Sequence, residues 1–258
     1  YYGKTVFLCA STIGSTQVLL NTITPKFKNG LANSSGVLGH YLMDHCYNAR
    51  AGGTLKGFDE EFYSGRRPTG IYIPNFQYTP SKYKSNYVRG YALGGDAQRG
   101  NYQSGAHQDG IGADFKDKLT RPGEWHFGFY VQGEMLPRYE NQVALHPTKK
   151  DKWGIPQLHF NASWSENEIL MMDDATQEME KMLKAIGVEN IYSFTSYNDK
   201  PPGSAIHELG TARMGRDPKD SVLNGYNQSH DIPNLFVTDG ASFCSSATVN
   251  PSLTFMAL

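Results

Sequence analysis

The chain has 258 residues, 39% of them hydrophobic, and its 24 basic and 25 acidic residues give a formal net charge of −1. This length is enough for one large domain or two smaller ones with a buried core. The balanced charge, without long runs of either sign, excludes the electrostatic surface that binds nucleic acid or an anionic membrane, so we expect small neutral partners. Every apolar run is shorter than the roughly 20 residues of a membrane-spanning helix.

The chain opens with an apolar run of β-formers, Thr5–Ala10, which predicts a strand. Ser11 and Thr12 follow it, and a helix is expected over Ser15–Asn21. A turn from the carboxyl end of a strand into a helix directs backbone N–H groups to a place where an anionic cofactor binds. Most such turns are only structural, so the pattern by itself leaves both interpretations open.

Residues 51–203 consist of short β-rich segments separated by glycine, proline and asparagine, which predicts an antiparallel sheet. The clearest strands are expected at residues 70–74, 125–131 and 142–145. The glycine-rich stretch 94–112 is predicted to be a surface loop, because its glycines do not follow the spacing of a phosphate-binding motif.

One helix interrupts this region. Ser165 and Glu168 form a capping box at its start, and Gly187 marks its end. Methionine, alanine and leucine side chains repeat at helical spacing between these positions, which predicts a helix packed on a core.

The last quarter returns to the order strand, turn, helix. Asn234–Gly240 is expected to be a strand that ends in Asp239 and Gly240. Asn250, Pro251 and Ser252 precede a helix predicted to begin at Leu253, where the missing N–H of a proline costs nothing. Because the chain begins without Met and stops inside this apolar run, we expect it to be part of a longer protein.

The three cysteines are too few and too widely spaced for a disulfide framework or a metal site. We therefore expect Cys9, Cys46 and Cys244 to be buried free thiols, and no metal ligands. Among the eight histidines, His207 stands out because it lies in a run of small residues and glycines, Ala205–Gly215, where a ligand can approach the backbone closely. Its local sequence is compatible with a general base, but taken alone it favours a capping or buried structural histidine. Asn250 similarly fits a helix cap or a hydrogen-bond donor to a substrate.

Three segments resemble the C-terminal signature region of the glucose–methanol–choline (GMC) oxidoreductases, which use FAD: HELGTARMG (207–215), NLFVTDGASF (234–243) and ATVNPSLTFMAL (247–258). The resemblance implies that His207 is the general base and that Asn250 holds the same hydroxyl while hydride passes to flavin N5. It also implies that Asn250 and four further residues contact the flavin: Asp239, Gly240, Pro251 and Ser252.

CASTIGSTQVLLNT (9–22) and GLANSSGVLGHYLMDH (30–45) resemble the family's second FAD-contacting region and the segment after it, which implies cofactor contacts at Ala10, Ser11 and Thr12. The implied fold is α/β plus an antiparallel sheet (α+β). Residues 1–50 and 201–258 would be parts of an FAD-binding domain, and 51–200 an inserted substrate-binding domain. The family's glycine-rich dinucleotide motif does not occur in these residues, so the resemblance implies an upstream segment that supplies it.

The segment RMGRDPKDSVLNGYNQSHDIPNLFVTDGA (213–241) is similar to bacterial sugar and glycoside dehydrogenases. This implies oxidation of a secondary hydroxyl of a sugar, glycoside or polyol, with a haem or quinone electron acceptor in place of oxygen. The alternative from another class is a non-catalytic carbohydrate-binding module, because 16 Tyr, 13 Phe and 3 Trp provide rings that can stack on sugars, although core packing also accounts for such residues.

Overall fold

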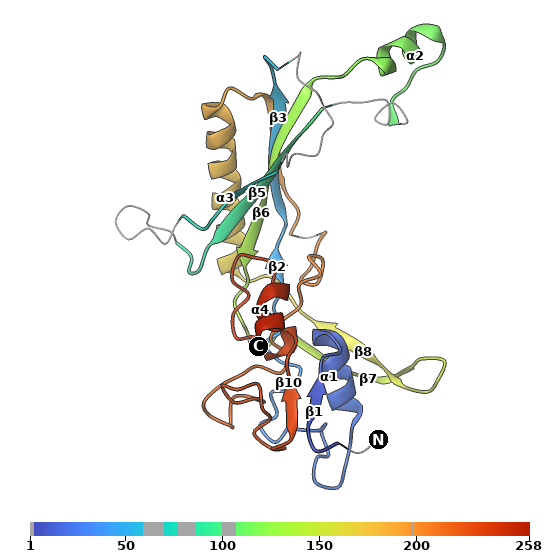
Figure 1. Ribbon diagram of the computed structural model, residues 1–258, viewed down its shortest axis with the longest axis vertical. Helices are drawn as coiled ribbons and strands as arrows, with labels where there is room; N and C mark the ends of the chain where they lie inside the picture. Colours follow the sequence, from blue (N-terminus) through green and yellow to red (C-terminus); the bar gives the residue numbers. More distant parts are fainter. Residues whose placement is uncertain (1–2, 59–69, 77–85, 100–106, 198) are drawn as a thin grey trace. The chain divides into compact units, whose positions relative to one another are not determined.

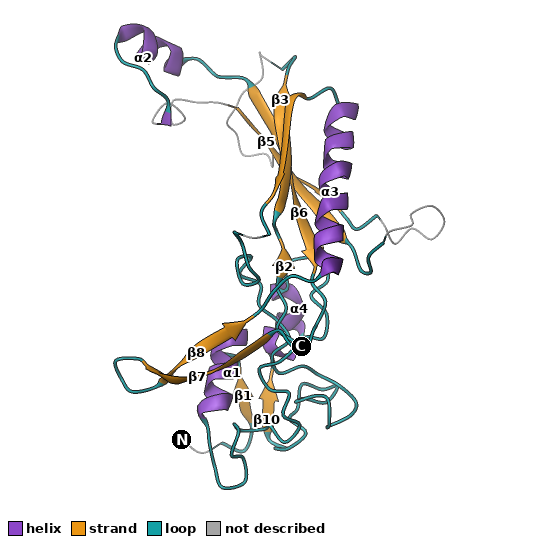
Figure 2. Cartoon of the chain, turned by 180° about the vertical axis from the view of Figure 1, so that it is seen from behind, coloured by secondary structure: helices purple, strands orange, loops and turns teal. Residues whose placement is uncertain are grey.

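A computed structural model describes residues 3–58, 70–76, 86–99, 107–197 and 199–258 (Figures 1 and 2). The chain divides into two compact units, each made of segments that are distant in sequence. The first unit comprises Tyr1–Cys46, Gly133–Ile169 and Tyr197–Leu258, and the second comprises Tyr47–Gln132 and Leu170–Ser196.

The first unit is built on two short parallel strands, β1 (Val6–Leu8) and β10 (Leu235–Val237), with helix α1 (Thr12–Asn21) directly after β1. These strands come from the two ends of the chain, and Figure 1 shows them side by side. Apolar residues of both strands, of α1 and of the intervening loops form one buried core: Leu19, Ala32, Val37, Leu38, Ala212, Val222, Leu223, Leu235, Val237 and Ala241.

The same unit holds an antiparallel hairpin of β7 (Gln142–Lys150) and β8 (Pro156–Asn161). The short helices η2 (Gly240–Ser242) and α4 (Ser252–Ala257) follow β10. A two-residue strand, β2 (His45–Cys46), pairs with Glu134 and Gly133 at the end of β6 (Trp125–Glu134).

The second unit is a sheet in the order β4–β5–β6–β3–β9, where β4 is Gly70–Ile73, β5 is Tyr91–Arg99, β3 is Ala49–Leu55 and β9 is Glu189–Thr195. Helix α2 (Ala113–Thr120) lies between β5 and β6 in sequence, and α3 (Glu166–Ala185) joins this unit from Leu170 onward. Figures 1 and 2 both show α3 alongside the sheet.

Helix α3 is attached to the sheet by polar contacts and by an apolar stripe. The Tyr91 hydroxyl donates to Asp174 (2.9 Å) and the Ser193 hydroxyl donates to Glu180. The side chains that the sequence placed at helical spacing are buried at Met172, Ala175, Met179 and Leu183. The predicted core-packing helix is therefore confirmed. One bond of its predicted capping box is also present, since the Ser165 N–H donates to the Glu168 carboxylate (2.7 Å).

The mixed α/β architecture with antiparallel sheets confirms the predicted fold class. The predicted surface loop over 94–112 is wrong at its start, because Gly94–Arg99 belong to β5. A Cβ atom at Gly94 would lie 2.2 Å from the Tyr130 ring, so glycine here permits close packing and does not mark a loop. The prediction of buried thiols holds for Cys46 and is wrong for Cys9, which is exposed beyond the end of β1.

The compact units also differ from the predicted domain boundaries at 133–169, which belong to the first unit. Long-range hydrogen bonds join this segment to the first unit: the Val143 N–H donates to the Gly39 carbonyl (2.8 Å), and the Gln17 amide donates to the Pro156 carbonyl (3.4 Å). Which part binds FAD and which binds substrate stays a prediction.

The helices of the described residues are too short or too polar to cross a lipid bilayer. Histidine, cysteine and carboxylate side chains in the described ranges do not gather into a group able to hold a metal ion.

Candidate active site

The parallel pairing of β1 and β10 brings two distant turns together. Leu8 pairs with Val237, so the residues after each strand emerge at the same edge, as the carboxyl ends of parallel strands must. Cys9 Sγ lies 3.1 Å from Thr238 Oγ1 across this edge. The Ser15 hydroxyl of α1 donates to Asp239, whose other carboxylate oxygen accepts from the Ala241 N–H (2.9 Å). Asp239 therefore ties the β10 turn to the first helix.

The segment that carries His207 lies along this turn. The Gly210 N–H donates to the Gly240 carbonyl (2.9 Å), and the Ala212 N–H donates to the Ala241 carbonyl (2.8 Å). Gly210 has a φ of 91°, and a Cβ atom there would lie 2.5 Å from the Tyr41 carbonyl oxygen. The small residues and glycines around His207 thus serve close backbone packing as well as access.

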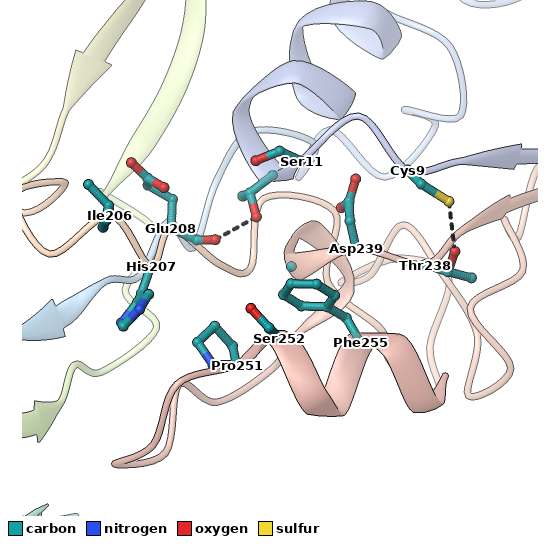
Figure 3. A pocket seen from close by; sticks show the side chains of 12 residues that line it. Cys9, Ser11, Ile206, His207, Glu208, Thr238, Asp239, Pro251, Ser252 and Phe255 are labelled. Atoms are coloured by element: carbon teal, nitrogen blue, oxygen red, sulfur yellow. Dashed lines mark hydrogen bonds between the residues drawn. The ribbon is translucent and has the colours of Figure 1, made fainter. Parts of the chain in front are cut away.

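A cavity of about 310 Å³ opens at this edge of the first unit (Figure 3). In the view of Figure 3, His207 lies at one end of the pocket and Cys9 and Thr238 at the other. The lining residues come from the two strand ends, the His207 segment and α4: Cys9, Ser11, Thr12, Ile206, His207, Glu208, Thr238, Asp239, Gly240, Pro251, Ser252 and Phe255. One pocket therefore gathers every residue that the sequence proposed for the site except Ala10 and Asn250.

Those two residues each adjoin a residue of the pocket wall. Ala10 precedes Ser11, and its N–H donates to the Ser15 hydroxyl (3.1 Å). Asn250 is exposed and directly precedes Pro251, which is the N-cap of α4. The helix-cap interpretation of Asn250 is therefore wrong by one position.

Two residues of the pocket wall have unusual backbone angles. Ser11 has a φ of 68° and Ile206 a φ of 57°, in the left-handed region that non-glycine residues rarely occupy. For a β-branched residue such as Ile206 this conformation is a genuine outlier, and strain of this kind costs about 1–3 kcal/mol. Strained residues gather at functional sites, so both angles favour a functional pocket.

A buried carboxylate holds the backbone in front of His207. Asp44 is fully buried, and its Oδ2 accepts from the N–H groups of Gly203 (2.7 Å) and Ala205 (3.0 Å). Its Oδ1 accepts from the N–H of His207 itself (3.1 Å). These three charge-assisted bonds fix the loop 203–207 from a position about 160 residues away in sequence.

The side chain of His207 contacts a second histidine, His45, which is 1% exposed. The two Nδ1 atoms are 3.1 Å apart, and the rings meet edge to face with centroids 5.0 Å apart. Burial lowers the pKa of His45 from 6.5 to about 4; the positive charge of His207 lowers it too, while Asp44 and the Ser246 carbonyl oppose the change. His45 is thus a neutral imidazole at pH 7.

The chemistry of the lining fits a flavin dinucleotide. The first turn of α1 consists of threonine, isoleucine, glycine and serine. The N–H groups of this turn form the positive end of the helix dipole, which lies at the pocket edge. Ser11, Thr12 and Ser252 add hydroxyl groups, and Phe255 adds an apolar ring. Donors for phosphate and ribose beside an apolar face are what such a cofactor requires.

The sequence did not single out several residues that the structure places at the site. Cys9, Ile206, Glu208, Thr238 and Phe255 line the pocket, and each adjoins a proposed residue or lies within four positions of one. Asp44 and His45 lie behind His207. They end the segment GLANSSGVLGHYLMDH (30–45), whose resemblance to the family assigned neither of them a role.

Comparison with known proteins finds one matching family and several relatives. Residues 137–258 match the family described as GMC oxidoreductase. The 2-methyl-1,2-propanediol dehydrogenase of Mycolicibacterium austroafricanum is 32% identical over 99% of this chain and 46% of its own length. The fructose dehydrogenase large subunit of Gluconobacter japonicus is 29% identical over 99% of this chain and 45% of its length. The gluconate 2-dehydrogenase flavoprotein of Pantoea cypripedii is 29% identical over 55% of this chain and 24% of its length.

A pocket at the carboxyl ends of two parallel strands, with a strained turn and a histidine in its wall, lies where α/β folds bind their ligands. The segments that carry His207, the β10 turn and α4 all lie within residues 137–258, the part of the chain that matches the GMC oxidoreductase family. The chain spans about half the length of the two relatives that it matches from end to end.

Proposed function

We propose that this chain forms part of an FAD-dependent oxidoreductase that removes hydride from a CH–OH group of a sugar, glycoside or polyol. The observation that carries the proposal is the pocket itself. It brings His207 together with the β1–α1 turn, the β10 turn and the start of α4, which are separated by up to 240 residues in sequence.

In this proposal His207 takes the proton of the substrate hydroxyl, for which a neutral imidazole is suited near pH 7. Asn250 holds the same oxygen by hydrogen bonding. Ala10, Ser11, Thr12, Asp239, Gly240, Pro251 and Ser252, with Asn250, contact the cofactor. FAD, when bound, supplies the acceptor for the hydride, which no side chain can provide.

The proposed substrate class rests on the relatives and on the second unit. One matched relative is named for a diol and two for sugars or sugar acids. On the sheet of the second unit, a depression of about 200 Å³ is lined by Arg50, Asp96, Gln98, His126, Tyr130 and Tyr192, among others. His126 and Tyr192 are stacked there with an interplanar angle of 4°. Flat rings beside paired polar groups suit a polyhydroxylated substrate, which supports a substrate-binding role for this unit.

We further propose that electrons leave to a haem or quinone partner, because two matched relatives are named as a subunit or flavoprotein of a dehydrogenase. The glycine-rich motif that binds the ADP half of FAD is proposed to come from sequence outside these residues.

The test begins with the full-length protein that contains this chain. After purification and denaturation, we expect stoichiometric release of FAD. Anaerobic mixing with a panel of sugars, glycosides and diols should then bleach the flavin absorbance with at least one class. A protein that releases no flavin would refute the oxidoreductase proposal. Sugar binding without any flavin would instead support a carbohydrate-binding module.

A further inference from the structure

The chemistry of a histidine base depends on which ring nitrogen carries the hydrogen. A neutral imidazole has one N–H and one lone pair, and the partner of one nitrogen decides the state of the other. The contacts behind His207 determine this state through two successive hydrogen bonds.

The first bond fixes His45. Its Nε2 lies 3.0 Å from the Ser246 carbonyl oxygen, and a carbonyl oxygen only accepts. Nε2 of His45 therefore carries a hydrogen and donates it. Because burial keeps His45 neutral, with a pKa of about 4, its Nδ1 carries the lone pair.

The second bond fixes His207. Its Nδ1 lies 3.1 Å from Nδ1 of His45, and this contact requires one donor and one acceptor. Since Nδ1 of His45 is the acceptor, Nδ1 of His207 is the donor. Neutral His207 then carries its lone pair on Nε2.

We propose that His45 and Asp44 are positioning residues for His207: His45 selects the tautomer with the lone pair on Nε2, and Asp44 holds the backbone that carries the ring. This inference rests on the proposed role of His207 as the base.

The same arrangement stabilises His207 after it has taken a proton. The Nδ1–H of the imidazolium still donates to His45, and a charge-assisted bond of this kind is stronger than a neutral one. The carboxylate of Asp44 accepts from the backbone N–H of His207, and Asp44 directly precedes His45, whose pKa its negative charge raises. Burial makes His45 a poor base, so the proton stays on His207.

One further charged group faces His45. Glu134 lies opposite it in the β2–β6 pair and accepts a hydrogen bond from the Ser245 hydroxyl. Substitution of His45 should leave this contact in place.

The test reads the tautomer directly. The full-length protein, with FAD bound, is labelled with ¹⁵N-histidine, and long-range proton–nitrogen NMR spectra are recorded at pH 7.5. The signals of His207 are assigned by their loss in the His207→Asn variant. We expect Nδ1 protonated and Nε2 unprotonated. A spectrum with Nε2 protonated in the wild-type protein would overturn the proposal, whatever the activity.

Two variants of His45 separate tautomer control from mere packing. In His45→Asn the side-chain oxygen reaches the place of Nδ1 and keeps the acceptor, whereas in His45→Gln the longer amide reaches the place of Nε2. We expect His45→Asn to retain the wild-type pattern. His45→Gln should give mixed tautomers and flavin reduction slower by about 10- to 100-fold, by analogy with the loss of a partner that orients a metal-bound histidine.

The control is His230→Gln, which removes a half-buried histidine bonded to the Ser221 hydroxyl (3.0 Å) and should leave the His207 spectrum unchanged. Equal His207 spectra and reduction rates for the Asn and Gln variants of His45 would refute tautomer control. If the expected tautomer is found but no substrate reduces the flavin, the proposed function fails, while the inference that His45 selects the tautomer of His207 stands.

Discussion

His45 should make stability depend on pH over a defined range. In the unfolded chain this histidine binds a proton near its ordinary pKa of 6.5, whereas burial in the folded protein lowers the pKa to about 4. Between these values the unfolded state binds more protons, so acidification favours unfolding. The stability that His45 contributes is complete above pH 6.5 and is lost as the pH falls to about 4.

The magnitude follows from the same values. A tenfold change in proton affinity corresponds to about 1.4 kcal/mol, so the lowering of the pKa of His45 corresponds to about 3 kcal/mol. His45→Asn and His45→Gln do not titrate in this range and should both flatten the pH dependence by about this amount.

The assay is urea denaturation of the full-length protein at intervals between pH 4 and pH 7, with each variant compared with wild type. The difference in free energy of unfolding should shrink toward low pH, because the wild type alone must protonate a buried ring. Parallel pH profiles for wild type and both variants would refute the burial argument for His45.

Further predictions concern neighbouring positions. Asp44→Asn replaces one acceptor oxygen by an amide N–H that faces a backbone N–H, and should lower the free energy of unfolding by about 1.5–3 kcal/mol in urea titrations. The control Asp231→Asn changes a carboxylate at surface contacts and should lower the free energy of unfolding by less than about 1 kcal/mol. Equal losses in the two variants would contradict the argument from the burial of Asp44. Gly240→Ala places a Cβ atom 2.5 Å from Thr12 Oγ1, so we expect the free energy of unfolding to fall by about 1–3 kcal/mol and the flavin-to-protein ratio to fall as well. In the control Gly225→Ala the Cβ atom enters open space, and the free energy of unfolding should change by no more than about 0.5 kcal/mol. Wild-type stability of Gly240→Ala would show that the turn adapts.

The sequence predicted the elements around the pocket because their signals are local. The apolar run at Val6–Leu8 and the one at Leu235–Val237 are both strands, and a helix follows each turn. Pairing between these strands joins residues about 230 apart, and neither run by itself specifies its partner. The resemblance to a known family led us to expect residues 1–50 and 201–258 in one domain, but it did not predict which strands pair.

Asp44 and His45 illustrate what local patterns cannot provide. Asp44 accepts from the backbone N–H groups that lead to His207, and His45 contacts the His207 ring. Both contacts lie beside the backbone pair of Met43 and Leu209, which is joined by two bonds of 2.9 and 3.0 Å. An acid next to a histidine is common in sequences, and only this long-range pairing gives the two residues a shared role. The glycines of β5 were wrongly predicted to lie in a loop. Gly94 lies in a strand, where its lack of a side chain leaves room for the Tyr130 ring.

The central claim is that His207 is the base of a flavin-dependent oxidation, and single-turnover kinetics test it most directly. The full-length protein and its His207→Ala variant are mixed anaerobically with the best substrate, and flavin absorbance is followed with time. The account predicts reduction slower by about 10²–10⁴-fold in the variant, with FAD still bound, as for loss of a general base. Unchanged reduction kinetics would remove His207 from the chemistry and contradict the account.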